Sequence, residues 1–145
     1  MTLSMKALMD NPDQLQYFLD NMDKSQQMVE ELIRYASPVY HFRRTATKDV
    51  EMHGKTIKEG DKVVMWFASG NRDPEKFANP YELDLTRFPN DHMTFGKGPH
   101  SCLGANLARL EIQESIAKYL ARKIAERVYR LLKYGEAYVR PEMHA

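Results

Sequence analysis

The sequence predicts an α+β fold that is mainly helical, and three observations lead to this prediction. Apolar residues recur every three to four positions over residues 2–19, 26–35 and 105–133, as they do in amphipathic helices. Residues 39–67 instead hold β-branched and aromatic residues that alternate with polar ones, which is typical of half-buried strands. The chain has 145 residues, 43% of them hydrophobic and 28% charged, so it is long enough to bury one modest core. We therefore expect one domain over residues 1–145.

The first part of the chain is expected to form helices separated by short breaks. Asn11 is placed as an N-cap, with Pro12 at the first helical position after it. Residues 21–25 are polar and predict a connection. The helix over residues 26–35 should end before Pro38, because a residue that precedes proline is pushed out of the helical region.

Residues 39–67 predict two or three antiparallel strands. Residues 39–50 should be extended, 51–55 and 58–61 should be turns, 56–57 should start a return strand, and 62–67 carry the strongest strand pattern. A short helix is then expected around residues 74–77, with irregular coil over residues 77–87. Residues 105–133 predict a long helix with Gly135 as its C-terminal stop.

Residues 95–104 form a glycine-rich loop around the only cysteine, Cys102. Glycines let the backbone turn sharply and approach a bound group closely. The helix that begins at Ala105 leaves free N–H groups and a positive dipole end beside the sulfur, and both favour a thiolate, the form that binds metal. His100 can place a donor near the edge of an anionic ligand.

Three other interpretations of this loop compete with a metal-binding thiolate. A single cysteine is commonly a buried small hydrophobe. A glycine-rich loop before a helix can bind phosphate, although this loop lacks the Gly-Lys-Ser/Thr and Gly-x-Gly-x-x-Gly patterns. His92, His100 and Cys102 offer three zinc ligands, but no Cys-x-x-Cys pair accompanies them.

The loop resembles a known haem-binding motif. Phe95, Gly98, Cys102 and Gly104 fill the pattern Phe-x-x-Gly-x-x-x-Cys-x-Gly, which is similar to the haem-binding loop of the cytochrome P450 family. His100 fits the basic position of that pattern, and the sequence Ala-Asn-Leu-Ala-Arg at 105–109 is similar to the start of the family's next helix.

Upstream motifs extend the resemblance in the family's order, over about residues 7–120. Glu31 and Arg34 share a helix face at i and i+3; such pairs are ordinarily surface ion pairs worth about 0.3 kcal/mol, but Glu-x-x-Arg is also a family motif. Arg44 and Arg87 stand where the family carries further arginines, and residues 71–74 read Asn-Arg-Asp-Pro as in the family. The sequences of residues 42–44 and 64–68 resemble those of soluble bacterial members of the family.

The resemblance implies a fold, a cofactor and residue roles. The fold would be the C-terminal portion of the cytochrome P450 fold: helices, a small antiparallel sheet, the cysteine loop and a long helix. The cofactor would be haem b, with Cys102 as the catalytic axial thiolate that favours O–O cleavage. The other implied roles are haem propionate binding by Arg44 and His100, shielding of the sulfur by Phe95, close backbone approach at Gly98 and Gly104, and a buried network of Glu31, Arg34 and Arg87.

Two departures from the family keep the function open. Family members are much longer, and their distal helix with its oxygen-activating acid–alcohol pair has no counterpart here; residues 121–145 also diverge. The first hypothesis is a fragment of a haem-thiolate monooxygenase that oxidises a small organic substrate with O2. The alternatives are a haem-binding or structural fragment without that activity, and a plain α+β interaction domain without haem. Exposed apolar surface from Leu107, Ile112, Ile116 and residues 63–67 would promote self-association.

Composition limits the partners and the compartment. The net charge of +1 argues against a nucleic-acid footprint, and no apolar run approaches the ~18 residues of a membrane span. The single cysteine suits a reducing compartment and no signal-peptide core is seen, so a cytoplasmic protein is expected. Residues 118–133 hold six basic residues and one acid; they predict either a solvated face or a docking surface for an acidic, ferredoxin-like electron-transfer protein.

Overall fold

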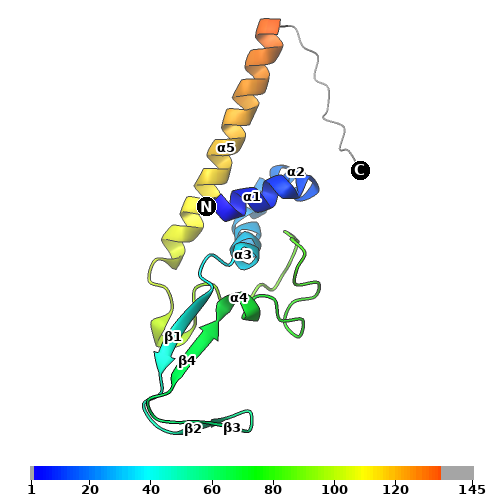
Figure 1. The fold of residues 1–145 in the computed structure, drawn as a ribbon. Helices are drawn as coiled ribbons and strands as arrows, with labels where there is room; N and C mark the ends of the chain where they lie inside the picture. Colours follow the sequence, from blue (N-terminus) through cyan, green and yellow to red (C-terminus); the bar gives the residue numbers. More distant parts are fainter. Residues whose placement is uncertain (1, 135–145) are drawn as a thin grey trace.

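The computed structural model describes residues 2–134, and it confirms a mainly helical α+β fold (Figure 1). The helices are α1 (Thr2–Asp10), α2 (Pro12–Asp20), α3 (Ser25–Ala36), α4 (Phe67–Gly70) and α5 (Ala105–Tyr134), with 3-10 turns η1 (Met22–Lys24) and η2 (Gly98–His100). The strands are β1 (His41–Thr45), β2 (Val50–Met52), β3 (Lys55–Ile57) and β4 (Lys62–Trp66). Gly135, the expected stop of the last helix, lies outside the described residues.

Helix α3 lies at the centre of the core, where α1 and the first half of α5 pack against it. Leu32 of α3 and Ile116 of α5 are both 0% exposed, and Ile112 also belongs to the core. The expectation that Ile112 and Ile116 expose apolar surface was therefore wrong, because both face α3; Leu107 does stay 60% exposed.

The break between α1 and α2 falls at Asn11, as expected, but its side chain acts on the other helix. Its amide Nδ2 donates to the carbonyl of Ala7 at 2.8 Å, and it makes no side-chain cap to α2. The backbone carbonyl of Asn11 instead accepts the Leu15 N–H at 3.0 Å. Asn11 therefore satisfies a carbonyl at the end of α1, while Pro12 starts α2 without needing an N–H partner.

The strands form two separate antiparallel pairs. β1 pairs with β4, with His41 opposite Trp66 and Thr45 opposite Lys62. β2 pairs with β3 around the turn His53-Gly54, whose φ values of 48° and 72° are both positive, as a tight two-residue hairpin requires. The turn predicted over residues 51–55 was too wide, since the strands continue up to Met52 and resume at Lys55.

A short helix follows β4, but not where the sequence pattern placed it. Residues 67–70 form α4, while residues 74–77 make only turns. The Lys76 and Phe77 N–H groups both bond to the carbonyl of Asp73, which gives a single turn. It does not continue because Asn79 has a φ of 45° and is followed by Pro80.

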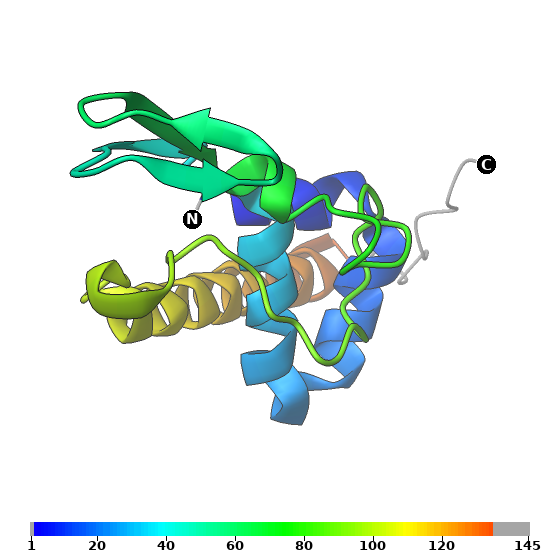
Figure 2. The ribbon, with the colours of Figure 1, turned by 90° about the horizontal axis from the view of Figure 1, so that it is seen from below.

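The coil between α4 and η2 runs alongside α3, and the second half of α5 extends past the body formed by α1, α2 and α3 (Figures 1 and 2). Irregular coil over residues 77–87 was expected and is observed. No helix within residues 2–134 is both long enough and apolar enough to cross a membrane.

Candidate functional site

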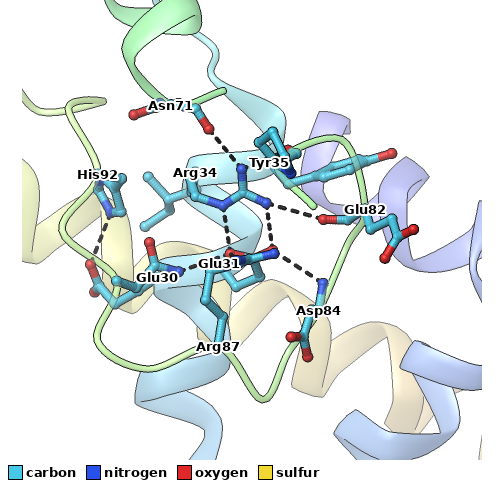
Figure 3. A network of polar contacts seen from close by, with 12 residues as sticks. Glu30, Glu31, Arg34, Tyr35, Asn71, Glu82, Asp84, Arg87 and His92 are labelled. Carbon is cyan, nitrogen blue, oxygen red and sulfur yellow. Dashed lines mark hydrogen bonds and ion pairs between the residues drawn. The ribbon is translucent and has the colours of Figure 1, made fainter. Parts of the chain in front are cut away.

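A buried ion pair on α3 holds the coil in place. The Arg34 guanidinium donates from Nε and Nη2 to the two carboxylate oxygens of Glu31, both at 2.7 Å, and Arg87 Nε donates to Glu31 Oε2 at 3.1 Å (Figure 3). The Glu31 and Arg34 side chains are 0% exposed and Arg87 is 10% exposed. The structure thus brings the three residues together, and the pair is not on the surface. Bidentate, charge-assisted hydrogen bonds of this kind are among the strongest in proteins.

The remaining bonds of this pair go to the coil. Arg34 donates from Nη1 and Nη2 to backbone carbonyls, and Glu31 accepts from a backbone N–H and an amide side chain. The carbonyls belong to Asn71 (2.7 Å), Pro80 (2.8 Å) and Glu82 (3.1 Å), and the donors are Asp84 N (3.1 Å) and Asn90 Nδ2 (2.9 Å). A coil without ladder bonds is thereby fixed by side chains of one helix.

Asn71 is a second anchor, which the sequence alone did not reveal as one. Its side chain is fully buried; Nδ2 donates to the hydroxyls of Ser37 and Thr94, both at 2.8 Å, and Oδ1 accepts the Met93 N–H at 2.7 Å. Asn71 therefore ties the end of α3 to the segment that enters the cysteine loop. In the sequence it stands in a Gly-Asn-Arg-Asp-Pro run whose composition indicates only a turn.

Glu30, next to Glu31, organises a third cluster. Its carboxylate contacts His92 Nε2 at 3.0 Å and accepts from Arg109 Nε at 2.5 Å and Nη2 at 3.1 Å. Burial raises the pKa of Glu30, but the bonds to His92 and Arg109 outweigh it and lower that pKa to about 2. The bond to Glu30 in turn raises the pKa of Arg109. The cluster joins α3, the segment before the loop and the first turns of α5.

His92 is engaged in this cluster and is not part of a metal site with Cys102. Its Nδ1 accepts the Thr94 N–H at 3.3 Å while Nε2 faces Glu30. Within residues 2–134, no three His, Cys, Asp or Glu side chains are grouped to hold a metal ion. The zinc interpretation therefore has no geometric support in the part of the chain that the structure describes.

The cysteine loop is a compact turn that presents its thiol outward. The Cys102 N–H donates to the carbonyl of Phe95 at 2.8 Å, and Gly96 and Gly98 adopt φ values of 69° and 74° that other residues rarely reach. Cys102 is exposed, so its interpretation as a buried hydrophobe was wrong. A Cβ on Gly104 would lie 4.0 Å from the Cys102 sulfur, which is ordinary contact.

Aromatic contacts connect the cysteine loop to β1, the strand that carries Arg44. Phe67 links the loop to β1: its ring lies 3.8 Å from the place where a Cβ on Gly96 would be, and 5.7 Å from the ring of Phe42. The Arg44 guanidinium lies 5.7 Å from the Phe42 ring, and both residues are exposed. His100 is also exposed, at the end of η2.

These features fit a haem. Such a group needs an accessible thiolate for its iron, an apolar surface for its ring and cations for its propionates. Phe95 is partly buried against the core, and Arg109 lies 4.7 Å over its ring, so the first residue of the loop is contacted on both sides.

The basic segment at residues 118–133 does not lie beside the cysteine. It belongs to α5, and a helix rises ~1.5 Å per residue, so its cations lie about 20–42 Å along the axis from Ala105. A single small partner docked over Cys102 would not reach most of them.

The cysteine loop resembles the haem-binding loop of haem-thiolate proteins, and comparison with known proteins gives the family. The model of the family described as Cytochrome P450 matches residues 10–122. A putative cytochrome P450 126 of Mycobacterium tuberculosis is 47% identical over 116 residues, which are 80% of this chain and 28% of that protein. The biotin biosynthesis cytochrome P450 of Bacillus subtilis is 43% identical over 119 residues, 82% of this chain and 30% of that protein.

A solved cytochrome P450 structure resembles this chain in both fold and sequence. The structure of P450BioI in complex with an acyl carrier protein ligated to hexadec-9Z-enoic acid matches with a TM-score of 0.81 and 42% identity, over 83% of this chain and 32% of that one. The chain belongs to the cytochrome P450 family, as its cysteine loop and Glu-x-x-Arg motif indicated. It spans 28% and 30% of the length of the two curated relatives described above.

Proposed function

We propose that this chain supplies the cysteine-side haem site of a cytochrome P450 monooxygenase that oxidises a small organic substrate with O2. The observation that carries the proposal is the exposed Cys102 on a loop that is tied to α3 on both sides, by the buried Thr94 hydroxyl on the carbonyl of Ile33 and by the partly buried Glu30–Arg109 ion pair. The cofactor is haem b, which when bound supplies the oxygen chemistry of the family.

Each residue of the proposed site has its own role in binding haem. Cys102 provides the thiolate for the iron, and the start of α5 favours its charged form. Arg44 and His100 donate to the propionates. Phe95 keeps water from the sulfur, while Gly98 and Gly104 leave the backbone free to approach the ring. The network of Glu31, Arg34 and Arg87 keeps the coil, and therefore the loop, in register.

Electrons must come from outside this site, and a ferredoxin-like acidic protein is the donor we propose. Its place is the cysteine side of the haem, where Lys97 and His100 are exposed. Lys97 is paired with Asp91, so a docking carboxylate would have to compete with that pair. The more distant cations of α5 are not required for such contact.

Haem binding without monooxygenase activity is the second candidate. It requires only the cysteine-side site described above, with the exposed Cys102 and the exposed basic residues Arg44 and His100. The two candidates agree on Cys102 and differ only in turnover.

The test is reconstitution of the full chain with haem, followed by reduction and addition of carbon monoxide. A strongly red-shifted Soret band that disappears in Cys102→Ser and persists in the neighbouring control Ser101→Ala would support thiolate ligation. A band typical of nitrogen ligation, or no haem uptake, would refute the site. Oxidation of hexadec-9Z-enoic acid, chosen because P450BioI was solved with its carrier-bound form, would support monooxygenase activity; the band without product would favour the second candidate.

A further inference from the structure

The second half of α5 carries a surface that the haem site does not use. We call residues 121–133 the outer segment; every one of them is exposed, and Figure 1 shows this end of α5 beyond the other helices. Ile112, Ile116 and Leu120 form a buried row at four-residue spacing on the inner half. The same row continues outward as Ile124, Val128 and Leu132, which are 60%, 49% and 78% exposed.

The outer segment is amphipathic. At about 100° per residue, its apolar residues fall within an arc of about 120°. These residues are Ala121, Ile124, Ala125, Val128, Leu131 and Leu132, and we call them the apolar stripe. The width of this stripe is what a surface helix presents to a core or to an apolar medium, yet here it faces solvent.

The rest of the outer segment is strongly basic. It holds five cations and one carboxylate, namely Arg122, Lys123, Arg127, Arg130, Lys133 and Glu126. Glu126 already binds Arg122 at 3.0 Å and Lys123 at 3.4 Å, so it adds no free negative charge. On the helical projection Arg127 borders one edge of the apolar stripe, and Tyr129 and Arg122 border the other.

The charges and the apolar stripe restrict the partner. A second copy of this chain would bring the same cations against each other, which like-charge repulsion disfavours. A shaped protein groove is best filled by large aromatic anchors, and the apolar stripe contains only Ala, Ile, Val and Leu. An anionic lipid surface offers both negative headgroups for the flanking cations and a fluid apolar layer for the apolar stripe.

We propose that the outer segment of α5 binds an anionic membrane surface, lying in the plane of the headgroups with the apolar stripe inward. Such binding requires no membrane-spanning helix. It is therefore compatible with the absence of a long apolar run, which argues only against a segment that crosses the membrane. The proposal is independent of haem binding, because all residues involved lie far along α5 from Cys102.

The test is co-sedimentation of the full chain with vesicles of phosphatidylcholine, with and without phosphatidylglycerol. We expect binding only to vesicles that contain phosphatidylglycerol, and weaker binding as salt is raised. Arg122→Gln with Arg127→Gln, which removes the cations at the two edges of the apolar stripe, should weaken it about thirty-fold, since each cation near such a surface contributes about five-fold. Ile124→Gln with Val128→Gln should weaken it by about ten-fold or more through lost apolar burial.

The matched control is Lys48→Gln with Lys55→Gln, which removes the same charge from the turn before β2 and from β3. These strands lie at the opposite end of the molecule (Figure 1), so binding should be unchanged. Far-UV circular dichroism checks that each variant keeps its helix content. The proposal would be overturned if the Ile124→Gln, Val128→Gln variant bound anionic vesicles as tightly as the unchanged protein. It would also be overturned if the unchanged protein did not bind these vesicles. A dimer that Ile124→Gln dissociates, or binding of the segment to an acidic protein alone, would overturn it as well.

Discussion

Replacement of Glu31 by glutamine tests whether the buried ion pair holds the coil. Glutamine keeps the size of the side chain but removes its charge, and its NH2 group cannot accept a hydrogen bond. The carboxylate it replaces accepts from Arg34 twice, and also from Arg87, Asn90 and the Asp84 N–H. The substitution therefore leaves the guanidinium of Arg34, which is 0% exposed, without its counter-charge.

The expected loss follows from this burial. Removing one partner of a buried pair costs about 3–5 kcal/mol, because an uncompensated charge stays in the interior. The free energy of unfolding of a domain is only about 5–15 kcal/mol. Glu31→Gln should therefore lower the urea midpoint strongly, or leave part of the protein unfolded even without urea. Equilibrium unfolding in urea, followed by circular dichroism, measures the free energy directly.

The control is Glu114→Gln, the same chemical change in an exposed pair. Glu114 lies 3.8 Å from Lys118, and the two side chains are 59% and 79% exposed, so the expected loss is about 0.3–0.5 kcal/mol. If Glu31→Gln cost less than ~1 kcal/mol, comparable to this control, the network would not be what stabilises the coil.

The remaining predictions concern the other two clusters and the surface. Because the pKa of Glu30 is lowered to about 2 from 4.5, its stabilising effect is complete above about pH 4.5 and is lost as pH falls towards 2; Glu30→Gln should reduce the acid sensitivity of unfolding in that window. Asn71→Ala should cost about 2–3 kcal/mol in urea unfolding, because buried partners lose their bonds. Exposed Phe42 and Trp66 predict self-association in sedimentation velocity; a monomer at all concentrations would contradict it.

The helices and strands followed from local patterns, and their errors have local causes. Period and propensity located α3, α5 and the antiparallel strand region of residues 39–67, which holds four strands in two pairs and not the two or three strands that were predicted. They could not place α4, because Phe67 continues the apolar run of β4 in the sequence and turns inward only when the chain meets the core. Likewise, the burial of Ile112 and Ile116 depends on α3, which lies about 80 residues earlier in the chain.

The cysteine loop could be predicted because its residues are contiguous, and the network of Glu31, Arg34 and Arg87 was implied by the family resemblance, whereas the contacts of Glu30 and Asn71 could not be predicted. His92 and Arg109 lie 62 and 79 residues from Glu30, and each is an ordinary surface residue by type. Asn71 was read only as a turn residue, because its partners Ser37 and Thr94 also lie far from it in the sequence. Only the Glu31–Arg34 spacing of three gave a local signal, and that signal is equally consistent with an exposed pair.

The two neighbouring glutamates of α3 have separate tasks. Successive residues on a helix point about 100° apart, so Glu31 faces the coil of residues 71–90 while Glu30 faces His92 and Arg109 on either side of the cysteine loop. Loss of Glu31 should therefore act mainly on global stability, and loss of Glu30 mainly on the position of the loop. Arg109 also lies over Phe95, whose carbonyl accepts the Cys102 N–H, so Glu30 connects α3 to the cysteine through Arg109 and Phe95.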